Sequence, residues 1–115
     1  LFILSFSIAA AACNNATQDK AGDPNKNFAS FETRFLDAYW KQYPTNSIFI
    51  GYGKYYDNLV IPDSMAIASN LAFSKQWTDS LNQPNIKLLS DNNKISVNII
   101  KNQLESDTWY QSGFR

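Results

Sequence analysis

The sequence contains no histidine, and this absence removes more chemistry than any residue present supplies. Histidine is the side chain whose ordinary pKa lies nearest to neutral pH, and it is a common metal ligand. Ser-His-Asp and Cys-His catalysis are therefore excluded within these 115 residues. Pairs of carboxylates, such as Glu32, Asp37 and Asp57, remain formally open, but no spacing singles out one pair. The sequence thus predicts no catalytic residue, no metal ligand and no cofactor in this part of the protein.

The sequence also has no excess of positive or negative charge. Lys plus Arg and Asp plus Glu number ten each, with no run of like charge. A protein that binds DNA or RNA normally presents a basic face to the phosphates, so nucleic acid is not an expected partner. Aromatic residues are plentiful instead, with three Trp, six Tyr and eight Phe. This composition is typical of a folded domain.

Cysteine occurs once, at Cys13, which excludes a disulfide within these residues. Residues 1–12 before it carry no charge and end in four alanines, and the residues after it are polar. An apolar run of about a dozen residues is too short to span a bilayer as a helix but suits a secretory signal. Small residues followed by a cysteine resemble a bacterial lipobox, in which the thiol is acylated and becomes the new N-terminus. Ala10 stands where leucine is usual in that pattern.

Cys13 is accordingly interpreted as a lipidation site, and its lipid as the anchor of an exported protein on the outer membrane or the periplasmic face. Two alternatives stay open: an ordinary signal with Ala-x-Ala cleavage, or a buried N-terminal helix. The predicted organisation is a lipoprotein signal over residues 1–13 and a disordered tether over residues 14–27. Residues 28–115 then form the N-terminal part of a helical domain that continues beyond them, because both ends of the sequence look cut.

The predicted fold is mostly α, with about three amphipathic helices joined by Gly- and Tyr-rich loops. Aromatic residues at three- and four-residue spacing, from Phe28 to Tyr39, predict a first helix over about 30–42, capped by Asn27 or Ser30. Such a stripe usually forms core, and Asp37 and Lys41 on the same helix have the spacing of an ion pair. Residues 46–50 suit either a helical turn or a brief strand.

Two further helices are predicted, over about 64–82 and from about 91 to at least 110. The second is capped by Asp63 or Ser64 after Pro62. Its expected core residues are Ile67, Leu71, Phe73, Trp77 and Leu81. The apolar positions of the third are Ile95, Val97, Ile99, Ile100, Leu104 and Trp109. Three helices do not enclose a large core alone, so exposed apolar faces are expected to pack on the polypeptide that follows Arg115.

The stretch from Gly51 to Leu59 is a loop rich in glycine and tyrosine. Gly51 and Gly53 lack the third glycine or the Gly-Lys-Ser/Thr of a phosphate-binding loop, so they more simply permit backbone turns. Tyr52, Tyr55 and Tyr56 are candidates for residues that line a cleft, with ordinary packing as the alternative.

The order of these features resembles the start of the domain of unknown function 885 family. The resemblance is carried by residues 31–40, Pro44, Gly51, residues 56–59, and residues 89–95 leading to Leu104-Glu105 and Tyr110. Val97 and Asn98 depart from it, since an Asp-Tyr pair is more regular there.

The resemblance implies a mostly helical, exported bacterial protein of several hundred residues, similar to zinc metallopeptidases. In such proteins a His-Glu motif followed by Pro-Gly-His lies in the C-terminal half and would hold zinc, and a peptide is the implied substrate. None of those positions is in this sequence, so the resemblance implies a scaffold role for residues 28–115. The alternative is a non-catalytic surface lipoprotein that binds oligosaccharide or peptide through exposed aromatic residues.

Overall fold

The computed structural model describes residues 22–58 and 60–113, and these residues form helices and loops without a strand. The four α-helices are α1 (Pro24–Gln42), α2 (Pro44–Phe49), α3 (Ser64–Leu81) and α4 (Asp91–Gly113). Two short 3-10 turns, η1 (Gly53–Tyr55) and η2 (Ile86–Leu88), lie in the connections. The predicted mostly α fold is confirmed, as are the second and third helices to within a few residues.

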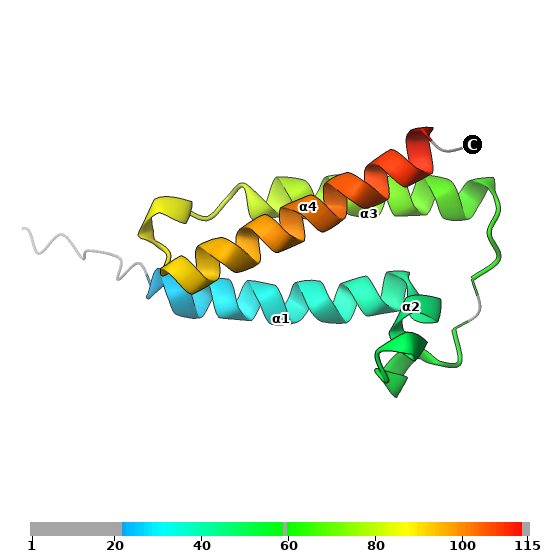
Figure 1. The fold of residues 1–115 in the computed structure, drawn as a ribbon, viewed down its shortest axis with the longest axis horizontal. Helices are drawn as coiled ribbons and strands as arrows, with labels where there is room; N and C mark the ends of the chain where they lie inside the picture. The colour runs from blue at the N-terminus through cyan, green and yellow to red at the C-terminus, as the bar shows by residue number, and fades with distance from the viewer. Residues whose placement is uncertain (1–21, 59, 114–115) are drawn as a thin grey trace, which may run out of the picture.

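Three long helices, α1, α3 and α4, make up the body of the structure (Figure 1). α4 lies against α3, and α2 and η1 turn away from the C-terminal end of α1 (Figure 1). The beginnings of α1 and α4 are joined by Asn25, whose Oδ1 accepts hydrogen bonds from the Ser90 backbone N–H at 2.8 Å and from Asn93 Nδ2 at 2.9 Å.

The first helix begins earlier than its sequence pattern predicts. Asp23 is its N-cap, with a carboxylate oxygen that accepts from the Asn25 backbone N–H at 2.9 Å, and Pro24 occupies the first helical position. Proline suits that position because its fixed φ is helical and its missing N–H would have no partner there. Residues 24–27 therefore belong to α1 and not to the tether, and neither Asn27 nor Ser30 is the cap.

The aromatic stripe of α1 is the centre of the core. Phe28, Phe31, Phe35 and Tyr39 are all buried, as their spacing predicts. The Trp77 ring of α3 makes edge-to-face contacts with Phe31 and Phe35, with ring centroids 5.5 and 5.4 Å apart. This is one of the two geometries that aromatic pairs prefer, because the electropositive ring edge meets the electronegative face.

Both other long helices are also capped by side chains. Asp63 caps α3 by accepting from the Ala66 backbone N–H at 2.8 Å, which settles the choice between Asp63 and Ser64. Ser90 Oγ accepts from the Asn93 N–H at 3.3 Å at the start of α4. Each such cap satisfies a backbone donor that the helix itself leaves without a partner.

Only part of the apolar sequence of α4 faces the core. Val97, Ile100 and Leu104 are buried, whereas Ile95 and Ile99 are 58% and 64% exposed. The reason is geometric: α4 packs through one face, and residues 95 and 99 lie on the opposite side of the helix.

The segment after α1 forms a helix, so the alternative of a brief strand is wrong. α2 begins at Pro44, and the fully buried Ser47 donates its hydroxyl hydrogen to the Pro44 carbonyl at 2.7 Å. Gly51 then reverses the chain with a φ of 75°, in the left-handed region that residues with a Cβ rarely adopt. This turn directs the following tyrosines back over α1.

We expect Leu104→Ala to destabilise the protein by about 2–5 kcal/mol, because Leu104 is completely buried and its removal leaves a cavity between the helices. Leu88→Ala is the matched control, since Leu88 is 60% exposed and should cost well under half as much. The measurement is the free energy of unfolding in urea. Equal losses for the two variants would contradict the placement of Leu104 at the centre of the core.

Candidate functional site

The carboxylate of Asp37 gathers three side chains from the segment that folds back over α1. It accepts hydrogen bonds from the Tyr52 hydroxyl at 3.0 Å, the Tyr55 hydroxyl at 2.8 Å and the Lys54 ammonium at 2.5 Å. The Lys54 Nζ also lies 5.2 Å from the centre of the Tyr55 ring. Asp37 thus ties η1 to α1, and we call these four residues the Asp37 cluster.

The sequence predicts a different partner for Asp37. Its spacing from Lys41 suits an ion pair within α1, but the salt bridge that the structure contains joins Asp37 to Lys54, seventeen residues away. The turn at Gly51 makes this pairing available, and the two tyrosine hydroxyls favour it further. A cluster of this kind leaves no signal in local sequence spacing.

The charges of the Asp37 cluster stabilise one another's ordinary protonation states. Hydrogen bonds from Lys54 and then Tyr55 hold the pKa of Asp37 below its usual range. The hydrogen bond to Asp37 raises the pKa of Lys54 and of Tyr52. Asp37 is therefore a firmly ionised carboxylate, which suits an anchoring role better than that of a general base near neutral pH.

A groove of about 640 Å³ opens beside this cluster. Its lining comes from α1 and from the folded-back segment: Thr33, Arg34, Leu36, Asp37, Trp40, Tyr52 and Lys54. Of the tyrosines considered from sequence, Tyr52 lines the groove, Tyr55 supports it through Asp37, and Tyr56 lies apart and exposed. That these tyrosines line a substrate cleft stays a prediction.

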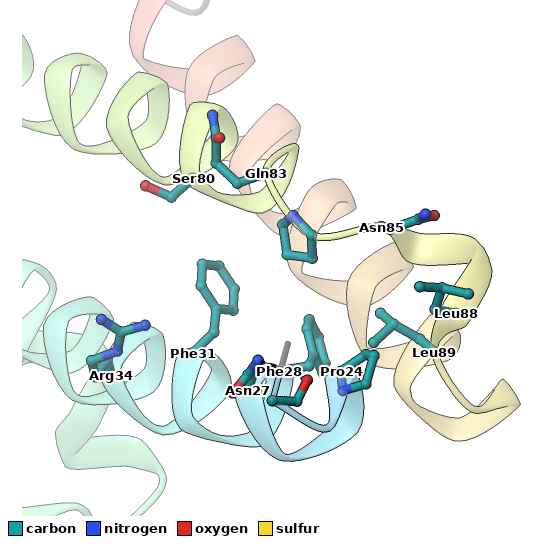
Figure 2. Close-up of a pocket in the computed structure, with 12 residues that line it drawn as sticks. Pro24, Asn27, Phe28, Phe31, Arg34, Ser80, Gln83, Asn85, Leu88 and Leu89 are labelled. Atoms are coloured by element: carbon teal, nitrogen blue, oxygen red, sulfur yellow. Dashed lines mark hydrogen bonds between the residues drawn. The ribbon is translucent and has the colours of Figure 1, made fainter. Parts of the chain in front are cut away.

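A second groove, of about 540 Å³, lies between the beginning of α1 and the connection from α3 to α4 (Figure 2). Phe28, Leu88 and Leu89 supply apolar lining, and Phe31 projects from α1 toward the end of α3 (Figure 2). Amide side chains of Gln83 and Asn85 stand at its edge (Figure 2). The groove therefore combines an apolar floor with amide side chains and the Arg34 guanidinium at its edge.

A partly buried polar cluster lies between the helices, near the C-terminal ends of α1 and α4. It consists of Tyr39, Tyr43, Ser74, Gln103 and Asp107, and Gln103 Nε2 donates to Asp107 Oδ1 at 2.9 Å. Within the described part of the chain, the atoms Tyr43 Oη, Ser74 Oγ and Asp107 Oδ2 are buried and have no hydrogen-bond partner. Buried polar atoms of this kind are commonly satisfied by ordered water.

Burial dominates the electrostatics of this cluster. Burial first, and the Asp107 charge second, raise the pKa of Tyr43 to about 12 and raise that of Tyr39 as well. Burial also raises the pKa of Asp107, against the smaller opposing effects of Gln103 and Tyr39. Sequence reasoning missed Asp107, although its spacing from Ile100 and Leu104 places it on the buried face of α4.

Three further findings bear on the predicted sites. Cys13, the predicted lipidation site, lies outside the described residues. Between residues 22 and 113, residue 59 aside, no three His, Cys, Asp or Glu side chains gather into a group that suits a metal ion. None of the helices in this same region combines the length and the apolar character that crossing a membrane requires.

Comparison with known proteins gives one informative match. No protein-family model matches the sequence. No curated protein matches it. A solved structure from Shewanella oneidensis, described as a candidate lipoprotein of unknown function, superposes with a TM-score of 0.73 at 33% sequence identity. The match covers 76% of this chain but only 16% of that one, so this chain spans a small part of a much longer protein's length.

We expect the protein to lose stability as the pH rises from about 10 toward 12. Below the ordinary tyrosine pKa of about 10, the neutral Tyr43 contributes fully to the stability of the folded protein. This contribution is lost as the pH rises through the pKa of about 12 that Tyr43 has in the folded state. The free energy of unfolding in urea should therefore fall across this range. Tyr43→Phe, which has no proton to lose, should show a shallower fall, and an unchanged slope would contradict the buried environment of Tyr43.

Proposed function

We propose that this chain is the N-terminal scaffold of an exported bacterial lipoprotein whose full-length form is a zinc-dependent peptidase or hydrolase, with the catalytic residues outside these 115 positions. The observation that carries the proposal is the match to the Shewanella oneidensis protein. It includes most of the folded part of this chain and only 16% of that much longer chain. The resemblance to the domain of unknown function 885 family adds the enzyme class.

The lipoprotein part of the proposal has two independent supports. The uncharged residues 1–12 followed by Cys13 have the arrangement of an export signal with a lipidated cysteine. The Shewanella oneidensis protein is itself described as a candidate lipoprotein. Two or more acyl chains on one cysteine would anchor the protein stably, since each buried methylene contributes about 0.8 kcal/mol.

Two features of the described residues support the scaffold role. These residues form an aromatic core between α1 and α3, and the Asp37 cluster fixes the folded-back segment on α1. In the family that the sequence resembles, the residues that would hold zinc lie in the C-terminal half, so they would lie outside this part of the protein. The groove beside the Asp37 cluster would then contribute one wall of the substrate cleft, with Tyr52 and Trp40 facing a peptide.

The groove also supports a second candidate function, a non-catalytic module that binds oligosaccharide or peptide. Trp40 and Tyr52 offer aromatic surface, and Arg34 and Lys54 supply positive charge beside it. Aromatic faces of this kind stack on sugar rings and apolar side chains. The two functions can be told apart by the His-Glu motif, because the enzyme requires it in the C-terminal half of the protein and the binding module does not.

We expect Cys13→Ser to release the exported protein from the membrane fraction, because serine cannot carry the thioether-linked lipid. Labelled palmitate should be incorporated by the natural protein and not by the variant, and cell fractionation reports the location of each. Membrane retention and labelling that survive the substitution would overturn the lipoprotein assignment.

We expect the full-length protein to bind zinc and to hydrolyse peptides, and the fragment of residues 14–115 to do neither. The reason is that the implied zinc ligands lie downstream of Arg115. Metal analysis of both purified proteins and peptide hydrolysis, before and after chelation, provide the test. A full-length protein that binds peptide or oligosaccharide without zinc or hydrolysis would favour the binding module instead.

A further inference from the structure

Helix α4 has a second face that suits burial. On the side opposite its buried residues, an uncharged strip runs along the helix, and we call it the outer strip. Its members are Ile95, Ile99, Asn102, Ser106, Trp109 and Gly113. They follow one another at alternating spacings of four and three residues, which is the spacing of a seam between two packed helices. All of them are exposed in the structure.

Except for Asp91 in the first turn, the charged residues of α4 lie away from this strip. Lys94, Lys101 and Glu105 lie together on one flank, and Lys94 pairs with Asp91 and Lys101 with Glu105 along the same helix. The solvent-exposed face of a helix normally carries its charged residues, as this flank does. The outer strip carries none, and it presents two β-branched aliphatic side chains to solvent at more than half exposure.

The observations favour an occupant from the same polypeptide. The similar chain from Shewanella oneidensis is several times longer than the matched part, so a protein of that architecture has ample further chain to cover the strip. A stable dimer needs about 800 Å² buried on each partner, and the strip is narrow, with polar Asn102 and Ser106 in its middle. A covalently linked segment needs less area, because it does not lose the translational freedom of a separate partner.

We propose that the outer strip of α4 is the docking surface of a helix from the C-terminal remainder of the polypeptide, so that α4 becomes a central helix packed on both faces. This inference rests on the proposed function only in requiring that the chain continues beyond residue 115. It adds where the scaffold meets the remainder: through the face of α4 turned away from α1 and α3.

The test uses the full-length protein expressed from its own gene. A photo-reactive benzoylphenylalanine replaces Ile99, and in the matched control it replaces Lys101, which is exposed on the charged flank of the same helix turn. After irradiation, we expect Ile99 to cross-link to a peptide beyond residue 115 of its own chain, identified by mass spectrometry, and Lys101 to give little of that product. Cross-links between two copies, or to another protein, would overturn the inference.

A second measurement avoids the bulk of the photo-reactive group. Ile99→Cys should react with a maleimide about tenfold more slowly than Lys101→Cys in the folded full-length protein, because a docked helix must open locally before the thiol is reached. Equal rates would overturn the inference. Zinc-dependent hydrolysis together with equal maleimide labelling rates would contradict the docking surface but not the proposed enzyme. Slow labelling of Ile99→Cys without zinc binding would contradict the proposed enzyme but not the docking surface.

Discussion

The interlocking of the α1 aromatic stripe with Trp77 is the contact on which the rest of the structure depends. Phe31 and Phe35 both make edge-to-face contacts with Trp77, and Phe73 continues the contact toward Tyr39 and Tyr43. Large rings allow helices to be held together across a wide separation, because each ring contributes 150–250 Å² of buried surface. Both grooves described above use part of α1 as a wall, so their shape depends on how this aromatic contact positions α1.

Polar groups decide how the elements around that core are fixed. Asn25 joins the beginnings of α1 and α4, and Asp37 holds the segment that returns after Gly51. The partly buried polar cluster around Tyr43 and Asp107 lies where α1, α3 and α4 meet. An apolar core alone would tolerate several helix registers, whereas hydrogen bonds with fixed partners favour a single one.

Several large apolar side chains are exposed at one end of the helix bundle. Phe49, Ile61 and Met65 are each more than two-thirds exposed at the end of the bundle formed by α2 and the start of α3. Surfaces of this kind are typical of interfaces and of domains seen without their remainder. The scaffold role proposed above would account for these exposed side chains and for the outer strip of α4, because both would be covered by further polypeptide.

The sequence alone determined the helical class, the approximate bounds of α3 and α4, and the burial of the α1 stripe, because all of these depend on local spacing and local caps. Asp63 capped α3 as expected, whereas α1 began at Pro24 because Asp23 caps it and proline suits its first position. Only the tertiary structure decided that Asp37 pairs with Lys54, that Ile95 and Ile99 face outward, and that Asp107 is half-buried near Tyr43. Those outcomes depend on which residues the turn at Gly51 and the crossing of the helices bring together, and contacts between distant positions leave no periodic pattern in the sequence.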